Sequence, residues 1–539
     1  MVKADYLLKS NAVFTGKEDR PFSGAVAVKG NKIIKVMKKE DADRYEADSI
    51  LDYGNKMIMP GFVDAHVHYF MGAIAYSDHI CTKIANSVSE EHCVTIMKEY
   101  ASEHPEEERL LGIGWFPSNW GDAPLPSKKS LDEAFPDKPV YLIAADVHTL
   151  WMNTKALEES DIKVDMKPRS GSVGIDEKGE LSGLLFEPDA MAPAMLKVQE
   201  FKTAEMIKMN EAFLSHIARC GVTSISEMSA DPYKTEVFAK YCSLKEMEKQ
   251  GRLTVRMHIY TELAGHTDFT AAKKWQGILN SEKLRLSGVK GFVDGVTSTF
   301  TGLLLEPYSD RMDTRGIDVP NLSREEMEPC IIAANKAGLS VRLHAIADGS
   351  VRMALDMYEA AIRTNGSEGI YNTIEHIENI HPQDFHRFKE LQVIPSMQPY
   401  HLTLDAFEKV GRIGEERCRW EWPHKSLLKA GAVLAFGTDY PVVDFNPYPT
   451  IYAAVTRLDD NGEPTSANPQ ESISLAEALR AYTAGAAKAY GREDIGMLEE
   501  GKLADIIVVD KNLFEISKRE ILDCQTAMTM FDGKIIFEK

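Results

Sequence analysis

The feature that most constrains the fold is a unit that recurs along the chain, a helical segment that ends in glycine and leads at once into a short β-branched, apolar run. Clear examples are AFLSHIARCGVTSISEM (212–228), KEMEKQGRLTVRMHIY (245–260), IIAANKAGLSVRLHAIAD (331–348) and KSLLKAGAVLAFGTD (425–439). Glycine after a helix accepts the left-handed conformation that turns the chain into the next strand. Repeated units of this kind predict a parallel sheet, and many of them predict a closed barrel.

Eight candidate strands follow one another in the sequence, at 61–68, 222–228, 254–260, 288–294, 340–346, 372–377, 392–398 and 433–439. Eight is the number that a (β/α)8 TIM-like barrel requires, so we predict this α/β fold for residues 58–490. The gap after the first strand is far longer than one βα unit. Residues 69–205 are therefore predicted to be a large insertion on the C-terminal face of the barrel, with its own strands near 110–115 and 139–146.

The two ends of the chain have a different pattern, with alternating segments separated by turn residues. DYLLKSNAVFT and GAVAVKGNKIIKV read as a hairpin with its turn at Gly30-Asn31, and TAMTMFDGKIIFEK turns at Asp532-Gly533. We predict that residues 1–57 and 491–539 together form a small β-sandwich domain beside the barrel, with a structural role.

Charge and hydropathy exclude several functional classes. The formal net charge of −20 over 539 residues repels phosphate backbones, so nucleic-acid binding is not expected. No run approaches about 18 consecutive apolar residues, so no membrane span is predicted, and the N-terminus lacks the apolar core of a signal peptide. Seven scattered cysteines without a C-x-x-C pair are typical of reduced thiols. We therefore predict a cytoplasmic protein.

Two histidines, His66 and His68, end the first predicted strand in the segment MPGFVDAHVHYF (59–70). Because residues i and i+2 of a strand face the same way, the two imidazoles point together, as a chelating pair must. On its own, an H-x-H pattern is equally compatible with a half-buried strand. Other predicted strands, however, also end in ligand-capable side chains, namely Lys290, His344, His376 and Asp439. Strand ends meet at one mouth of a barrel, so this set predicts a site for zinc, manganese or iron.

Lys290 is the unusual member of this set, because an ammonium group is a poor neighbour for metal ions. One interpretation is an ordinary ion pair with Asp294, which lies on the same face of the strand. The other is a buried lysine whose pKa falls, so that its free amine reacts with carbon dioxide. The resulting carbamate is anionic and could bridge two metal ions.

Motifs in the same order as the strands resemble the amidohydrolase superfamily. They are PGFVDAHVH, VKGFVDGVTS, RLHAIADGSVRMALD, IEHIENIHPQDFHRFKELQVIPSMQPYH and GTDYPVVDFNPYPTIYAAVTR. Their details are similar to the amidohydrolase-3 branch, the YtcJ-like proteins that include N-substituted formamide deformylases, over residues 5–537. The branch commonly has a bulky residue where this chain has Gly291, on the face away from Lys290, and HAIGD where this chain has HAIADG.

This resemblance implies a two-metal centre. His66 and His68 would bind the more buried ion, Lys290 would be the carboxylated bridge, and His344 and His376 would bind the second ion. The expected cofactors are thus two divalent cations, most simply Zn²⁺, and a carbamate derived from carbon dioxide. A hydroxide that bridges the ions would attack an amide, an N-substituted formamide or a cyclic amide. Asp439 would be the general base, and His376 is the other predicted catalytic residue.

Contacts with the substrate are predicted from the motifs around the strand ends. The candidates are Trp115, His148, Trp151 and Asn153 in the insertion, with Gln398 and His401 after the seventh strand. The expected partners are a small-molecule substrate and a second copy of the chain in a homodimer. Two alternatives remain open: a mononuclear deaminase that uses His66, His68, His376 and Asp439, and a non-catalytic regulatory or scaffold relative.

Overall fold

The computed structural model describes residues 3–121, 124–145, 147–168, 171–228, 235–316, 322–466 and 468–539. The chain divides into two compact units. One comprises Met1–His68 and Leu214–Lys539, and the other is Tyr69–Phe213. The first unit contains the barrel and both chain ends, and the second is the inserted segment.

The first unit contains an eight-stranded parallel sheet whose strands follow one another in chain order, β6-β12-β13-β14-β15-β16-β17-β18. The strands are β6 (Phe62–Val67), β12 (Val222–Glu227), β13 (Arg256–Glu262), β14 (Leu284–Phe292), β15 (Ser340–Ala345), β16 (Thr373–His376), β17 (Ile394–Met397) and β18 (Ala435–Phe436). Each of the eight predicted strands coincides with one of them. The predicted barrel fold is therefore confirmed.

The first and last strands approach each other where the barrel closes. The N–H of His68 donates to the carbonyl of Tyr440 over 2.9 Å, and the N–H of Asp439 donates to the carbonyl of His66 over 2.8 Å. Val67 and Tyr440 form a parallel bridge. This seam brings the predicted ligands of strand one directly beside the carboxylate that follows strand eight.

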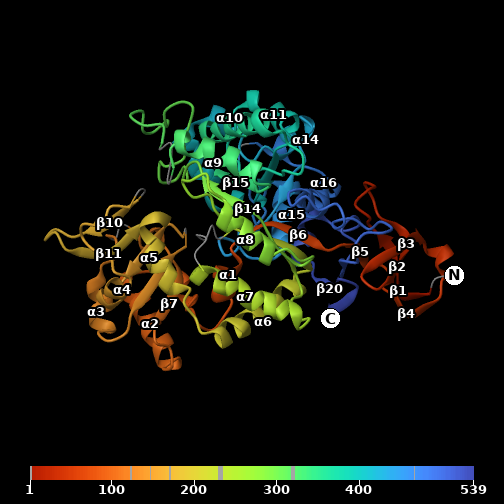
Figure 1. The fold of residues 1–539 in the computed structure, drawn as a ribbon, viewed down its shortest axis with the longest axis horizontal. Coiled ribbons are helices and arrows are strands. Elements are labelled where there is room, and N and C mark those ends of the chain that lie inside the picture. The colour runs from red at the N-terminus through yellow and green to blue at the C-terminus, as the bar shows by residue number, and fades with distance from the viewer. Residues whose placement is uncertain are drawn as a thin grey trace. The chain divides into compact units, whose positions relative to one another are not determined.

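Helices join the strands and cover the sheet; α9 and α10 pack against each other and against β15 (Figure 1). Gly338 and Gly431 follow the helices in two of the recurring units. Their φ angles are +74° and +85°, the left-handed conformation that the sequence predicts. The helices of this unit are α6 (Thr203–Arg219), which begins in the inserted segment, α7 (Thr235–Lys249), α8 (Thr270–Ile278), α9 (Arg324–Lys336), α10 (Asp348–Asn365), α11 (Phe385–Glu390), α12 (Leu402–Ile413), α13 (Glu415–Cys418), α14 (His424–Lys429), α15 (Pro447–Thr456), α16 (Leu475–Arg480) and α17 (Ala486–Lys488).

The inserted unit, Tyr69–Phe213, has its own five-stranded sheet in the order β10-β11-β9-β8-β7. Its strands are β7 (Leu110–Trp115), β8 (Val140–Ala144), β9 (Thr149–Met152), β10 (Ser172–Ile175) and β11 (Leu181–Phe186). Its helices are α1 (Tyr69–Ala75), α2 (Glu90–Glu103), α3 (Lys128–Ala134), α4 (Thr154–Glu159) and α5 (Pro188–Val198). The large insertion predicted after the first barrel strand is thus present, with strands at both predicted places.

Strands from both chain ends pair into one eight-stranded sheet, β21-β20-β19-β5-β1-β2-β3, with β4 beside β1 (Figure 1). They are β1 (Ala4–Val13), β2 (Phe22–Lys29), β3 (Lys32–Lys38), β4 (Ala47–Asp52), β5 (Met57–Pro60), β19 (Ile506–Val509), β20 (Thr526–Phe531) and β21 (Lys534–Glu538). Both predicted turns connect antiparallel strands. The pairing shows one sheet, so the sandwich and its limits, 1–57 and 491–539, remain predictions.

A buried ion-pair network fastens this end sheet to the barrel. Arg256, on barrel strand β13, is fully buried, and its Nε lies 2.8 Å from an Oδ of Asp505. Its Nη2 lies 3.1 Å from Asp532, in the last hairpin, and Asp532 also pairs with Lys283 at 2.8 Å. One barrel side chain therefore neutralises two carboxylates of the C-terminal segment.

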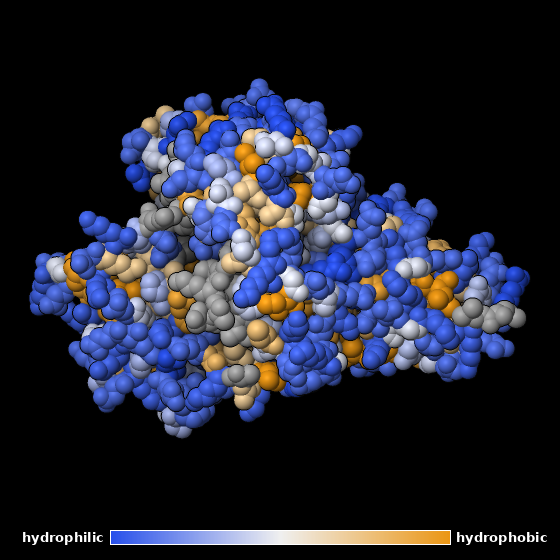
Figure 2. Space-filling model, viewed as in Figure 1, coloured by the Kyte–Doolittle hydropathy of each residue, from blue (hydrophilic) through white to orange (hydrophobic). Residues whose placement is uncertain are grey.

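The face shown in Figure 2 is predominantly hydrophilic, with hydrophobic side chains in small separate groups. This agrees with the excess of acidic over basic residues, 82 against 62. Among the described residues, no helix has the length and apolar character needed to cross a bilayer.

Candidate metal centre

The first barrel strand carries a β-bulge at the predicted ligand pair. Ile225 pairs with Asp64 and Glu227 with Val67, so three steps along β6 match two steps along β12. A bulge of this kind bends a strand and changes the direction of the side chains that follow. Here it lies at Ala65 and His66, immediately before His68.

Asp64, next to the bulge, joins strand one to strand eight. Its carboxylate accepts hydrogen bonds from the backbone N–H and the hydroxyl of Thr438, at 3.1 and 2.8 Å, and from the Tyr482 hydroxyl at 2.9 Å. A Cβ on Gly437 would lie 2.6 Å from the backbone nitrogen of His66, so only glycine lets the two strands come this close. Burial raises the pKa of Asp64 to about 7 despite these hydrogen bonds.

Three predicted ligands converge at the seam. Oδ1 of Asp439 lies 3.3 Å from Nε2 of His66 and 3.2 Å from Nε2 of His68. Among the described residues this buried oxygen has no hydrogen-bond partner, so neither contact is a hydrogen bond. Burial alone would raise the pKa of Asp439, but His66, His68 and His376 hold it well below its ordinary value. The site therefore presents an anionic oxygen between two imidazole nitrogens.

A second group of donors shares Asp439 with His376 and His401, and their ligand atoms lie within 4.8 Å of one another. Nδ1 of His376 is 3.9 Å from Oδ2 of Asp439 and makes no hydrogen bond to any residue that the structure describes. Burial, and then the nearby His344, hold the pKa of His376 well below its ordinary value, so its imidazole is neutral. The His401 ring stacks on that of His376 with centroids 6.3 Å apart. His401, predicted as a substrate contact, thus belongs to the donor cluster.

His344 lies beside this group rather than within it. Its ring centroid is 4.5 Å from that of His376, and its Nε2 donates to the carbonyl of Gly295 over 3.1 Å. A neutral imidazole that donates from Nε2 has its basic nitrogen at Nδ1. Nδ1 is therefore the atom of His344 that could bind a metal ion.

Lys290 is almost fully buried, and its Nζ makes no hydrogen bond among the described residues. The alternative pairing with Asp294 is not formed, because that carboxylate accepts the backbone N–H groups of Ile346 and Leu303, each over 2.9 Å. Burial lowers the pKa of Lys290 to about 8, against the opposing charges of Glu375 and Asp439. An amine in this state is neutral for much of the time near pH 8 and can act as a nucleophile.

The backbone is left-handed at two of the predicted ligands. His376 has φ of +74°, the following Ile377 +52°, and Asp439 +61°. Such conformations disfavour side chains other than glycine by roughly 1–2 kcal/mol each. Strained residues of this kind concentrate at functional sites, where the surrounding structure holds them in place.

The donor set fits a divalent metal. It consists of imidazole nitrogens and one carboxylate, the chemistry that zinc and similar ions prefer. Its unpaired atoms, Oδ1 of Asp439, Nδ1 of His376 and Nζ of Lys290, are buried at one end of the barrel, where polar groups normally find partners. Bound cations would satisfy the oxygen and the imidazole, and a carbamate would satisfy the lysine.

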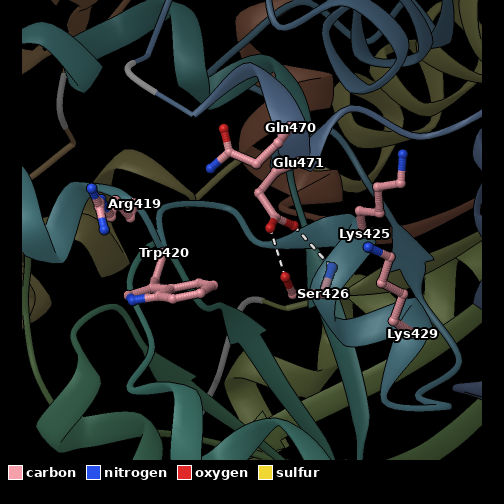
Figure 3. Close-up of a pocket in the computed structure, with 7 residues that line it drawn as sticks. All are labelled: Arg419, Trp420, Lys425, Ser426, Lys429, Gln470 and Glu471. Carbon is pink, nitrogen blue, oxygen red and sulfur yellow. Dashed lines mark hydrogen bonds between the residues drawn. The ribbon is translucent and has the colours of Figure 1, made fainter.

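A separate surface pocket of about 570 Å³ lies elsewhere on the same unit (Figure 3). In it, the carboxylate of Glu471 accepts hydrogen bonds from the backbone N–H and the hydroxyl of Ser426, at 2.9 and 2.6 Å. The other lining residues are Arg419, Trp420, Lys425, Lys429 and Gln470. None of the lining residues belongs to the donor cluster, so the pocket is distinct from the predicted site.

A family model described as "Amidohydrolase family" (Amidohydro_3) matches residues 49–537. The chain belongs to the amidohydrolase family. The resemblance to the amidohydrolase-3 branch is thereby confirmed.

Relatives of this amidohydrolase span nearly its full length. The Arabidopsis thaliana protein LONG AFTER FAR-RED 3 is 29% identical over 547 residues, which cover 99% of this chain and 92% of that protein. The N-substituted formamide deformylase of Arthrobacter pascens is 24% identical over 532 residues, which cover 96% and 95%. The crystal structure of an uncharacterized metal-dependent hydrolase from Pyrococcus horikoshii OT3 has a TM-score of 0.77 and 26% identity, covering 95% of this chain and 99% of that one.

The predicted substrate contacts in the insertion of this amidohydrolase include three buried structural residues. Trp115 and Trp151 are fully buried in the core of the inserted unit, with ring centroids 5.8 Å apart. Asn153 caps α4 by accepting the N–H of Ala156, and its amide donates to two backbone carbonyls. These roles account for all three side chains. His148 is partly exposed and pairs with Glu187 at 2.7 Å, and its contact with substrate remains a prediction.

Sequence reasoning missed Glu375, the fully buried residue that orients His66 in this amidohydrolase. Nδ1 of His66 donates to Glu375 over 2.8 Å, which leaves Nε2 as the basic nitrogen of the ring. Burial alone would raise the pKa of Glu375, but Arg342 and His66 hold it well below its ordinary value. Arg342, also fully buried, donates to the carboxylate over 3.1 Å. The signal was available, since both charged residues lie in predicted barrel strands within two positions of a histidine.

We expect Glu375→Gln to weaken metal binding by about 10- to 100-fold, because a neutral amide holds the imidazole less firmly and makes it less basic. Competition with a metal-binding dye measures the dissociation constant. Glu390→Gln, at an exposed carboxylate on α11, is the matched control and should leave the constant unchanged. If Glu375→Gln and Glu390→Gln bind the metal with the same dissociation constant, Glu375 does not support His66.

Proposed function

We propose that this amidohydrolase is an enzyme that hydrolyses a carbon–nitrogen bond of a small molecule, namely an amide, an N-substituted formamide or a cyclic amide. The observation that carries this proposal is the convergence of His66, His68 and Asp439, whose donor atoms meet at 3.2–3.3 Å without hydrogen bonding. Membership of the family supports the reaction class. The predicted homodimer is part of the same proposal.

The site would hold two divalent cations, preferably Zn²⁺. His66, His68 and Asp439 would bind the first, and His376 with His344 or His401 would bind the second. When bound, such ions activate water and polarise the carbonyl that is attacked. Lys290, buried beside Glu375 and Asp439, would supply a bridging carbamate once its amine has added carbon dioxide with loss of a proton.

Asp439 would act as general base and then as general acid. Its low pKa keeps the carboxylate anionic, so it can accept a proton from water at neutral pH. The Asp439 carboxyl group would then deliver that proton to the nitrogen of the leaving amine. His376 remains neutral and contributes a nitrogen ligand without competing for the proton.

The direct test is turnover of N-formyl amines, N-acyl amines and cyclic amides by zinc-loaded protein, with release of amine as the readout. Chelated protein should be inactive, and zinc should restore activity. Formation of ammonia from an amino-substituted ring, but no amide cleavage, would favour the mononuclear deaminase. Protein that binds no metal after purification without chelator would favour the non-catalytic alternative.

We expect Lys290→Met to lower the bound zinc from two ions per chain to one or fewer, because the bridge between the ions is lost. Metal analysis by mass spectrometry measures this ratio. In wild-type protein, ¹³C-labelled bicarbonate should give a carbamate signal in the carbon NMR spectrum that Lys290→Met lacks. Lys274→Met, at an exposed lysine on α8, should change neither result. One ion per chain in both the wild type and Lys290→Met would contradict the bridging role.

A further inference from the structure

We propose that Gln398 recognises a second, unreacted amide group of the substrate, so that the preferred substrates carry a primary carboxamide or a lactam besides the bond that is cleaved. This inference rests on the proposed function and deepens it by naming a substrate class. Its starting point is a side chain in an unusual state. Gln398 is 1% exposed, yet neither Nε2 nor Oε1 has a hydrogen-bond partner among the residues that the structure describes.

Strand register places Gln398 beside the metal centre. Ser396 on β17 pairs with Glu375 on β16, and Glu375 faces the barrel interior, where it bonds His66. Neighbouring residues of a parallel sheet share a face, and so do residues i and i+2 of a strand. Gln398 lies two residues after Ser396, just past the end of β17, and therefore on the same interior face.

The neighbouring strand fixes the height of Gln398 in the barrel. The carbonyl of Met397, the preceding residue, accepts the N–H of Gly437 over 3.2 Å, and Asp439 follows two residues later. His401, three residues after Gln398, contributes to the donor group with Asp439. Gln398 therefore lies at the same end of the barrel as Asp439 and His401.

A buried carboxamide with two unpaired ends is costly, so its presence needs an explanation, and a bound ligand that completes the hydrogen bonds is one. The amide of glutamine offers one acceptor and two donors in a plane. A carbonyl with an N–H on the same side, as in a primary carboxamide or a lactam, matches this edge with two parallel hydrogen bonds. A carboxylate or an N,N-dialkylamide can only accept, so it would leave Oε1 buried and unpaired.

A matched series of formamides tests this inference. N-formylphenylalaninamide has the complete amide edge, its N,N-dimethylamide lacks the donor, and N-formylphenylalanine carries a carboxylate. We expect kcat/KM for the carboxamide to exceed the other two by about 10- to 100-fold, the ratio for one or two lost hydrogen bonds. 3-Formamidopiperidin-2-one and its N-methyl lactam form a second pair, which decides between a primary carboxamide and a lactam as the preferred group.

Variants assign the preference to this side chain. Gln398→Met has a similar volume without the amide, so the ratio of kcat/KM between carboxamide and dimethylamide should fall towards one. Gln383→Met, at an exposed glutamine after β16, should keep the wild-type ratio. A ratio near one in the wild type, or a ratio unchanged in Gln398→Met, would overturn the inference. If Gln398→Met does not fold, the wild-type series alone decides.

Binding of the amine product separates this inference from the proposed function. Calorimetry on zinc-loaded protein should show that phenylalaninamide binds at least about tenfold more tightly than its N,N-dimethylamide. If no formamide, N-acyl amine or cyclic amide is turned over but this difference is present, the reaction class is wrong and the recognition stands. If turnover occurs without either preference, the reaction stands and the role of Gln398 is wrong.

Discussion

Asp439→Asn should retain bound metal but lose about 10²- to 10⁴-fold in kcat, the usual contribution of a general acid–base group. The substitution keeps the shape of the side chain and an oxygen ligand, while it removes the negative charge that accepts the proton. His66 and His68 are unchanged, so the site should still bind zinc. The measurements are kcat for the best formamide and metal content per chain.

Asp444→Asn is the control, because this exposed aspartate lies only five residues later in the same segment. Its kcat should stay within about twofold of wild type, as for most surface substitutions. An Asp439→Asn protein that keeps its metal and turns over substrate at the wild-type rate would exclude Asp439 as the base. Loss of metal in this variant would instead identify the carboxylate as chiefly a ligand, and the base would have to be sought elsewhere.

Arg256→Met should lower the free energy of unfolding by about 3–5 kcal/mol, the effect of leaving buried carboxylates without their partner. Asp505 is 4% exposed and would lose the charge that lies 2.8 Å away. Urea denaturation followed by circular dichroism gives the shift in midpoint. Adding Asp505→Leu to Arg256→Met should recover part of the loss, because the unpaired charge is then removed as well.

The same network predicts a pH dependence. Burial alone would raise the pKa of Asp532, but Lys283, Asn31 and Arg256 hold it at about 2. A carboxylate with a lowered pKa stabilises the fold above its unfolded pKa, about 3.9, and this stabilisation is lost as the pH falls towards 2. The difference in the free energy of unfolding between wild type and Arg256→Met should therefore become smaller as the pH falls from 5 to 2. Arg519→Met, at an exposed arginine, should differ little from wild type at either pH.

The fold could be predicted from the sequence because each barrel strand has a local signal. Short apolar runs located all eight strands within a few residues, and in four of them a glycine that ends a helix comes just before the run. Alternation along the first strand placed His66 and His68 on one face. Their position at a strand end placed them with Asp439 at one mouth of the barrel, where the structure brings the three together. These features depend on residues close in sequence, and local patterns determine them.

Contacts across the barrel could not be predicted in this way. Glu375 orients His66 although the two residues are 309 positions apart, and no local pattern pairs them. Aromatic residues gave a weaker signal still, because a tryptophan such as Trp115 is more often part of a core than of a pocket, and its burial in the inserted unit is a fact of the fold. His401 shows the same limit: its residue type indicated a role near the site, but only the fold groups it with His376.

The seam between the first and last barrel strands has a consequence for biosynthesis. Asp64 and Thr438, whose hydrogen bonds join the strands that carry the predicted ligands, are 374 residues apart in the chain. A ribosome must therefore complete most of the polypeptide before the proposed cations could find their full set of ligands. Metal uptake would then be a late event that reports a correctly closed molecule, and C-terminal truncations that remove β18 should yield protein unable to retain zinc.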